Sequence, residues 1–512
     1  MADTAPSAPP PSPGPVGLFE ARDADWRNGA ITYQVLVDRY APSAQLPAKR
    51  HLYPAPKRLR DWSECPRQGQ FLEDARVWSH EIDFWGGDLQ SLRTHLRHII
   101  DLGADVLYLN PICHGYTNHK YDALDYAEVS PEYGTRQDVK DLADELHRHG
   151  MKLVLDGVFN HMGRQAPRFQ DALRSAASPW RNWFVFDERM PGGARSWMQA
   201  ENLPELNMEN PSVQAWLWGD RDSVVRGYLR DGVDGWRLDV AHDIGMDLLQ
   251  ALTQAAHEEK PGSLVVGELW NWPKEWFPAV DGVMNFSLRE IVLRCLDGRI
   301  TTTLALRMMA RMVAECGTEP LLKSWLMLDN HDTVRVATAL PNERARKMAQ
   351  LLQFTLPGAP NLYYGSELGM EGGADPEMRA PMRWDLATED NPTLRWTRQL
   401  IALRRQQRAL RVGDWRAVEC ERLLAFERHT DRVGETVIVL ANPSDRPVAE
   451  TVLVANSRLM NNSPVNDLLE PGRGHAPFLA GLLEVRLEPW EMRVLQPHVQ
   501  AERGYTTYKR VR

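Results

Sequence analysis

The chain has 512 residues, of which 43 % are apolar and 25 % charged, values that exclude a fibrous or wholly disordered protein and leave ample chain for a large core. Lys and Arg number 60 against 69 Asp and Glu, and the net charge of −9 gives no general attraction to nucleic acid or to an anionic membrane. No apolar run is long enough for a transmembrane helix, and five scattered cysteines without a C-x-x-C pair favour a reducing, cytoplasmic location.

Residues 1–28 begin MADTAPSAPPPSPGPVG and predict a Pro-rich disordered tail without a signal-peptide apolar stretch. From residue 31 onward, short runs rich in β-branched and aromatic residues recur between amphipathic segments. Each run has the length and composition of a buried strand. There are eight such runs: 31–39, 105–111, 152–160, 234–241, 263–270, 282–286, 324–332 and 361–367.

The segments between these runs place apolar residues three and four apart and end at Gly or Pro, which predicts helices. Eight alternating strand–helix units with near-continuous apolar strands predict an α/β fold, a closed (β/α)₈ TIM barrel. We assign residues 29–160 and 211–410 to this barrel.

Two connections are too long for plain loops. Residues 40–87 follow the first strand, and residues 161–210 follow the third and are predicted to form an inserted domain B. Both leave from the carboxyl ends of barrel strands, where barrel enzymes have their active sites, so we expect them to wall a cleft. After the last helix, residues 411–512 contain period-two runs that predict a C-terminal antiparallel β-sandwich.

Ionisable residues fall at the ends of the third, fourth, fifth and seventh strands and should meet at one mouth of the barrel. Arg237 and Asp239 lie two apart and share a strand face, so the guanidinium should lower the pKa of Asp239 and keep it charged. Glu268 follows an apolar strand, where burial should raise its pKa. A charged carboxylate beside a protonated one is the arrangement that a retaining glycosidase needs.

Four segments together resemble the signature regions of the α-amylase family, glycoside hydrolase family 13: DGVFNH (156–161), DGWRLDVAH (234–242), VGELW (266–270) and LDNHD (328–332). NHKYDALDY (118–126) and GGADPEMRAPMRW (372–384) are similar to the neopullulanase, cyclomaltodextrinase and maltogenic amylase group. That group usually carries an amino-terminal β-sandwich, whereas here a Pro-rich segment precedes the first strand.

The resemblance implies a nucleophile at Asp239, an acid/base at Glu268 and a third, transition-state-stabilising carboxylate at Asp332. It implies substrate-binding positions around them, at Asp156, His161, Arg237, His331, Tyr121 and Arg379. Trp270, two residues beyond Glu268, is the best candidate to contact the leaving-group sugar or the acceptor. Further tryptophans expected in the cleft-forming loops are Trp85, Trp197, Trp272 and Trp276.

The expected activity is hydrolysis of α-glucosidic bonds, mainly α-1,4, in maltooligosaccharides and cyclodextrins through a covalent glucosyl-enzyme. A transglycosylase moving glucosyl or maltosyl units, or an α-glucosidase acting on short α-glucosides, would use the same residues. A Mg²⁺-dependent barrel enzyme is disfavoured because Arg237 would compete with the cation, and a non-catalytic sugar-binding relative because all three carboxylates are present.

No cofactor is expected to be required. Asn160 is a candidate calcium ligand by resemblance, but the segment after Asp38 lacks the alternating Asp and Asn of a calcium loop. The expected partner is an α-glucan oligosaccharide, not nucleic acid or a membrane, and the sequence leaves the oligomeric state open.

Overall fold

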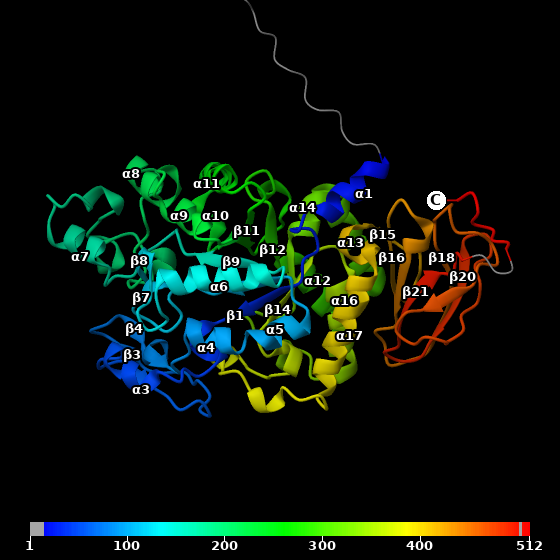
Figure 1. Ribbon diagram of the computed structural model, residues 1–512, viewed down its shortest axis with the longest axis horizontal. Helices are drawn as coiled ribbons and strands as arrows, with labels where there is room; N and C mark the ends of the chain where they lie inside the picture. Colours follow the sequence, from blue (N-terminus) through cyan, green and yellow to red (C-terminus); the bar gives the residue numbers. More distant parts are fainter. Residues whose placement is uncertain (1–14, 501–503, 512) are drawn as a thin grey trace, which may run out of the picture.

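The computed structural model describes residues 15–500 and 504–511 (Figure 1). Eight parallel strands form a closed barrel, and each strand overlaps one of the eight predicted runs, which confirms the predicted α/β architecture. Around the barrel they follow the order β1-β14-β13-β12-β11-β10-β9-β6. Their bounds are β1 (Thr32–Val35), β6 (Val106–Leu109), β9 (Lys152–Gly157), β10 (Gly235–Leu238), β11 (Leu264–Leu269), β12 (Gly282–Asn285), β13 (Trp325–Met327) and β14 (Ala359–Tyr363).

Side chains fill the inside of the barrel, so its centre is a packed core and not a pore. The interior cluster includes Tyr108, Val154, Val266, Met284 and Trp325, all almost inaccessible to solvent. Both faces of each strand are buried, which explains why the strands read as continuous apolar runs.

Helices cover the outside of the barrel and place one apolar stripe against it. In α6, Thr135 and Asp138 form a reciprocal capping box at the first turn, a feature worth about 1 kcal/mol, and Leu142 and Leu146 lie on the buried face. The helices around the barrel are α4 (Leu89–Thr94), α5 (Leu96–Leu102), α6 (Arg136–Arg148), α8 (Pro211–Gln214), α9 (Val224–Arg230), α10 (Ala241–Ile244), α11 (Met246–Glu259), α12 (Phe286–Leu296), α13 (Thr302–Cys316), α14 (Thr318–Lys323), α15 (Val336–Ala339), α16 (Glu343–Thr355), α17 (Pro392–Gln406) and α18 (Arg408–Val412).

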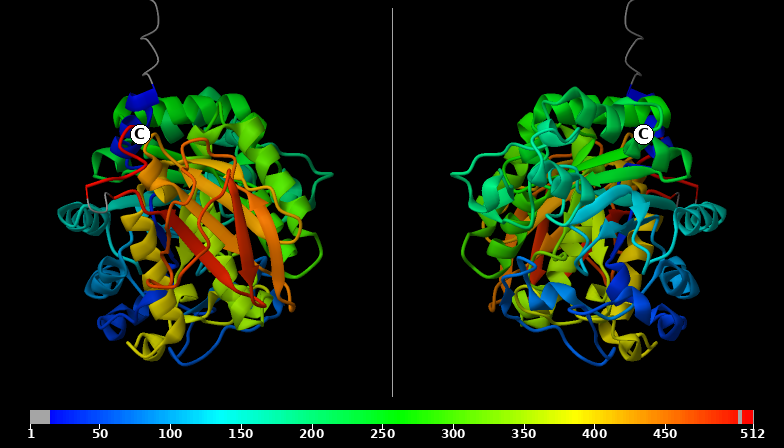
Figure 2. Two further views of the ribbon diagram at one scale, coloured as in Figure 1. Left: turned by 90° about the vertical axis from the view of Figure 1, so that its right-hand side faces the viewer. Right: turned by 90° about the vertical axis from the view of Figure 1, so that its left-hand side faces the viewer.

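The two long connections lie at one end of the molecule, at the left in Figure 1 and facing the viewer in the right panel of Figure 2. The connection after β1 has a small core of its own around Tyr53 and Phe84. The connection after β9 packs an aromatic cluster of Phe169, Phe184 and Phe186. Their elements, with the adjoining hairpin β7–β8, are α2 (Val37–Tyr40), α3 (Leu46–Lys49), β2 (Arg58–Leu59), β3 (Phe71–Leu72), β4 (Val77–Trp78), β5 (Asp83–Phe84), β7 (Cys113–Gly115), β8 (Ala123–Val129) and α7 (Pro167–Arg174).

The C-terminal strands form the predicted antiparallel β-sandwich at the opposite end, facing the viewer in the left panel of Figure 2. A five-stranded sheet and a two-stranded sheet enclose a second core that includes Leu440, Val452 and Leu483. The strands are β15 (Asp414–Ala417), β16 (Leu424–His429), β17 (Val437–Ala441), β18 (Val448–Leu453), β19 (Val465–Asp467), β20 (Leu482–Leu487) and β21 (Met492–Pro497). The exact domain boundaries stay predictions.

The predicted disordered tail is wrong for part of its length. Residues 1–14 lie outside the described residues, but α1 (Pro15–Ala24) is a helix docked on the protein body. Arg22 is buried there and pairs with Glu319 at 2.7 Å and Asp414 at 2.9 Å. These ion pairs and the buried Phe19 hold the helix in place, although the prolines before it suggested disorder. In the part of the chain that the structure describes, no helix is long and apolar enough to cross a membrane.

Candidate active site

Arg237 stands at the centre of a cluster of carboxylates at the carboxyl end of the barrel. It lies on β10 directly opposite Asp156 of β9, and its side chain is fully buried. Its Nη1 lies 2.8 Å from Asp156 and 2.9 Å from Asp239, and its Nη2 lies 2.9 Å from an oxygen of Glu268. The predicted pairing of Arg237 with Asp239 is therefore present, and Glu268 joins it on the other arm of the same guanidinium.

The charge balance of this cluster differs from the predicted one. Burial raises the pKa of Asp239 well above its ordinary value, against the opposing effect of Arg237, and the neighbouring carboxylates Glu268 and Asp156 raise it further. The predicted lowering of this pKa is wrong because burial outweighs the effect of Arg237, whose guanidinium is also shared among three carboxyl groups. The cluster therefore tends to retain a proton.

Replacing Arg237 by methionine should lower the free energy of unfolding by about 3 to 5 kcal/mol, because it would leave three buried carboxyl groups without their counter-charge. Urea denaturation at neutral pH measures the change. The matched control is Arg486→Met, because the side chain of Arg486 is 77 % exposed and its removal should cost within about 0.5 kcal/mol. A loss equal to that of the control would mean that protons already neutralise the cluster.

Glu268 lies at the end of β11 and accepts two hydrogen bonds that fix its orientation. The backbone N–H of Val240 donates to Oε2 at 3.0 Å, and the Trp270 indole N–H donates to Oε1 at 3.1 Å. Val240 has a φ of 46°, which is strained for a β-branched residue. In this conformation its N–H points at the carboxylate of Glu268. Trp270 is 53 % exposed and stacks on Phe286 with ring centroids 3.7 Å apart. An exposed, oriented ring thus stands beside Glu268.

Asp332 completes the set of three carboxylates and lies beside His331 and Arg379. Its oxygens lie 3.0 Å from Nε2 of His331 and 3.2 Å from Nη2 of Arg379. Burial opposes its ionisation, but His331, Arg379 and Arg237 together lower the pKa of Asp332 well below its usual range. Arg379 also donates from Nε to the backbone carbonyl of His331 at 2.9 Å. Asp332 is therefore ionised at neutral pH.

Tyr121 and His331 form one wall of the site. Their rings are parallel within 1° and their centroids lie 5.3 Å apart, and the Tyr121 hydroxyl donates to Asp156 at 2.9 Å. Asp156 also accepts from Tyr108 at 2.6 Å. The side chains of Asp156 and Arg237 have no exposed surface, and they contact Tyr121, Asp239 and Glu268.

His161 is buried at the start of the second long connection, and its ring lies 5.7 Å from that of Trp197. Burial lowers the pKa of His161 to about 4, so the imidazole is neutral at pH 7. Its Nε2 has no hydrogen-bond partner within the residues described by the structure. A buried nitrogen of this kind fits a hydroxyl group of a ligand.

Asn160 and Asp38 are the two positions considered for calcium, and each makes hydrogen bonds within the protein. Asp38 accepts from Nε of Arg39 at 2.7 Å and from the backbone N–H groups of Trp85 and Gly86, so its oxygens already have protein donors. The side-chain amide nitrogen of Asn160 lies 3.5 Å from Nδ1 of His161. Among residues 15–500 and 504–511, no group of three or more His, Cys, Asp or Glu side chains is placed to hold a metal.

The sequence prediction missed three polar residues that support the site. Gln34 of β1 lies 2.9 Å from Nδ1 of His331 and donates to the Asn110 side chain at 3.0 Å, and Asn110 donates to the Tyr121 hydroxyl at 3.0 Å. Tyr108 is the third, through its bond to Asp156. These residues could have been found in the sequence as polar groups within or directly after an otherwise apolar strand. Burying such a group costs free energy unless it has a hydrogen-bond partner.

Comparison with known proteins agrees with this geometry. Residues 34–391 match the family model described as alpha amylase, catalytic domain. The chain is 34 % identical to a cyclomaltodextrinase of Geobacillus thermopakistaniensis over 443 residues, covering 84 % of this chain and 71 % of the relative. It is 32 % identical to neopullulanase 2 of Thermoactinomyces vulgaris over 458 residues, covering 84 % and 72 %.

Solved structures show the same likeness. A ligand-free cyclic α-maltosyl-(1→6)-maltose hydrolase from Arthrobacter globiformis superposes with a TM-score of 0.77 at 28 % identity, covering 92 % of this chain and 100 % of that one.

Proposed function

Because the chain belongs to the α-amylase family, we propose that it is a retaining glycosidase that cleaves α-glucosidic bonds, mainly α-1,4, in maltooligosaccharides and cyclodextrins. The observation that carries the proposal is that Asp239 and Glu268 contact the two arms of one guanidinium. Their contact with one group fits the short separation of about 5 Å used by retaining enzymes better than the wider gap of inverting ones.

In the first step, an Asp239 oxygen attacks the anomeric carbon while Glu268 gives its proton to the glycosidic oxygen. The bond from carbon to that oxygen breaks, the shortened glucan leaves as an alcohol, and a glucosyl ester of Asp239 remains. This step requires that the proton retained by the cluster resides on Glu268 and that Asp239 is ionised when the sugar is bound. Deprotonated Asp239 faces Arg237, which stabilises its charge.

In the second step, Glu268, now a carboxylate, takes a proton from water, and the water oxygen attacks the anomeric carbon. The ester bond breaks and Asp239 is restored. Two inversions return the α configuration. Asp332, ionised and held by Arg379, is positioned to bind sugar hydroxyls in the transition state, Tyr121 offers its ring to the sugar face, and His161 and His331 offer hydrogen bonds to hydroxyls.

A sugar in place of that water would give transglycosylation, and the surroundings of Glu268 favour such an acceptor. The ring of Trp270 is exposed and donates to Glu268, the residue that protonates the leaving group, so it offers a stacking surface for an incoming sugar. Transfer is therefore the second candidate activity, with the same catalytic residues.

The test is a product time course on maltotriose, maltoheptaose, cyclodextrins, pullulan and sucrose, with the anomeric configuration of the first product followed by NMR. We expect shorter maltooligosaccharides released as α-anomers, and products longer than the substrate at high substrate concentration if transfer occurs. Short α-glucosides cleaved in preference would indicate an α-glucosidase. Initial release of the β-anomer would contradict the double-displacement mechanism.

We also propose that the protein acts in the cytoplasm and needs no metal. All five cysteines are free, as a reducing compartment would keep them, and no step above uses a cation.

A further inference from the structure

Gln34, in the middle of β1, contacts the ring of His331 at Nδ1, whereas Asp332 lies at Nε2 of the same ring. The Gln34 side chain is fully buried, and its oxygen accepts from the Asn361 amide at 3.3 Å. Its nitrogen donates to Asn110 Oδ1 at 3.0 Å and lies 2.9 Å from Nδ1 of His331. An amide nitrogen has two N–H groups and accepts no hydrogen bond. Gln34 therefore donates to Nδ1, and Nδ1 carries no proton.

The Tyr121 hydroxyl leads to the same assignment from the other end of the network. It lies 2.9 Å from Asp156, whose carboxylate is paired with Arg237 and can only accept, so the hydroxyl proton points to Asp156. The hydroxyl oxygen is then an acceptor for the Asn110 amide, at 3.0 Å, and for Nε2 of His331. If the proton were on Nδ1, two acceptors would face each other at Nε2. The proton of the imidazole therefore belongs on Nε2.

This proton lies on the side of the ring where the catalytic groups are. Nε2 of His331 is 3.0 Å from the carboxylate of Asp332, which is ionised. An N–H at this nitrogen donates to the carboxylate, whereas a lone pair would repel it. Gln34 has no exposed surface and cannot touch a substrate, so any effect it has on catalysis must pass through its neighbours.

We propose that Gln34 is a positioning residue that keeps Nδ1 of His331 free of a proton and so holds the proton on Nε2. The hydrogen bond made by one ring nitrogen of a histidine determines which of the two is protonated. His331 then presents an N–H to Asp332 and to a hydroxyl of the sugar being cleaved. The inference rests on the proposed function for the identity of that sugar, and it adds a residue of the barrel interior to the machinery that orients the site.

The first test observes the imidazole directly, by ¹⁵N NMR of protein labelled at histidine, without substrate. Protonated and unprotonated ring nitrogens have well separated signals, and the variant His331→Asn identifies those of His331 among the 15 histidines. At neutral pH we expect a proton on Nε2 of His331 and none on Nδ1. A proton on Nδ1 in the native protein would overturn the inference.

The second test changes Gln34. Gln34→Met has a similar length but no N–H, so the Nδ1 signal of His331 should move when its donor is lost. We expect kcat on maltoheptaose to fall about five- to thirtyfold, as for a buried acceptor left without its donor, and KM to change by less than about threefold. Gln34→Glu keeps the shape and places an acceptor at Nδ1, which should then gain a proton. Melting temperatures show whether each variant is folded.

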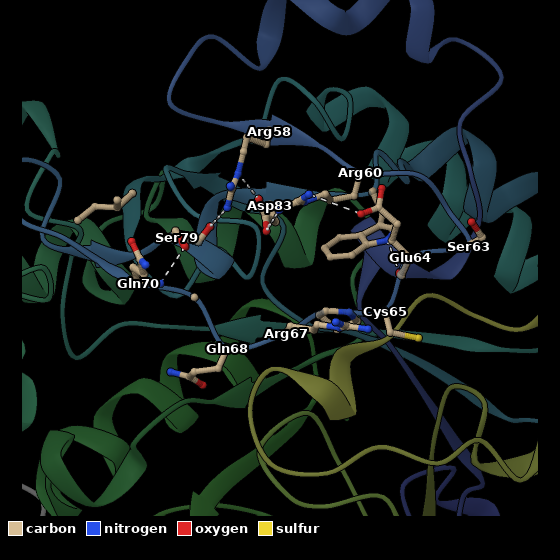
Figure 3. A pocket seen from close by; sticks show the side chains of 14 residues that line it. Arg58, Arg60, Ser63, Glu64, Cys65, Arg67, Gln68, Gln70, Ser79 and Asp83 are labelled. Atoms are coloured by element: carbon tan, nitrogen blue, oxygen red, sulfur yellow. Dashed lines mark hydrogen bonds and ion pairs between the residues drawn. The ribbon is translucent and has the colours of Figure 1, made fainter.

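The matched control is Gln68→Met, the same chemical change in the first long connection. Gln68 is exposed and lies beside a hollow of about 760 Å³, away from the barrel interior (Figure 3). It should leave the His331 signals and kcat unchanged. An Nδ1 signal that is the same in the native protein and in Gln34→Met, or an unchanged kcat in both Gln34 variants, would overturn the inference.

The two proposals fail in different ways because the NMR measurement needs no turnover. A protein with the proton on Nε2 that cleaves no α-glucan would count against the proposed function alone. An active glycosidase with the proton on Nδ1 would refute the role of Gln34 and leave the proposed function standing.

Discussion

Replacing Asp239 by asparagine should reduce the hydrolysis of maltoheptaose by roughly 10⁴-fold or more and leave oligosaccharide binding largely intact. An amide cannot form the proposed glucosyl ester, but it has nearly the same shape, and its oxygen can still accept from Arg237, which lies 2.9 Å away in the native protein. Reducing-end assays measure turnover, and calorimetry measures binding. The matched control is Asp243→Asn, because Asp243 lies four residues further on and its side chain is 37 % exposed.

Asp239→Asn should also change the thermal stability, in a direction that follows from the pKa of Asp239. The pKa of Asp239 is raised in the folded protein, so the folded state binds its proton more tightly than the unfolded state does. The resulting stabilisation is present at low pH and is lost as the pH rises through the folded-state pKa. Asparagine does not ionise, so the variant does not have to bury a negative charge at high pH. The melting temperature of Asp239→Asn should therefore exceed that of the native protein increasingly as the pH rises. Undiminished turnover, or a difference that shrinks with pH, would contradict the assignment.

Most of the fold could be predicted because buried parallel strands are continuous apolar runs, which can be recognised in the sequence alone. The failures have long-range causes. Residues 15–24 follow a Pro-rich segment, and their helix depends on ion pairs of Arg22 with Glu319 and Asp414, which lie far away in the sequence. The last strand begins at Ala359, two residues earlier than predicted, because it pairs with Trp325 of β13 and a partner strand is not visible in the sequence.

For the site, the sequence predicts which residues come together, but not how buried they are or which charges they share. The strand-end rule brought Arg237, Asp239 and Glu268 together correctly, because all parallel strands end at one mouth. It could not show that the side chain of Asp156 is fully buried, nor that one guanidinium serves three carboxyl groups. Trp85 lies in the first long connection, as expected, and is buried there, with the guanidinium of Arg39 3.8 Å from its ring centre. Burial and charge sharing depend on which side chains pack together, and these contacts are long-range.

Replacing Glu268 by glutamine should separate substrates by the quality of their leaving groups. We expect a loss of about 10²- to 10⁴-fold on maltoheptaose, whose departing alkoxide needs a proton, and a much smaller loss in the first step on an aryl α-glucoside with a strongly acidic phenol. Glutamine has nearly the same shape and keeps one oxygen, which can still accept from Val240 N–H, although its amide group cannot also accept from the Trp270 N–H that Oε1 of Glu268 binds. Rapid-mixing kinetics on the aryl glucoside should show a burst of phenol, because the glucosyl ester then waits for a base that is absent.

Azide needs no general base, so adding it should speed breakdown of that ester and yield an α-glucosyl azide. The matched control is Trp270→Phe, which removes only the indole N–H donated to Oε1 of Glu268 and keeps an aromatic ring beside it. It should reduce the rate less than Glu268→Gln and should not produce a burst. Equal losses on both substrates for Glu268→Gln would show that this residue does not protonate the leaving group, because a proton donor must matter least where the leaving group is already stable as an anion.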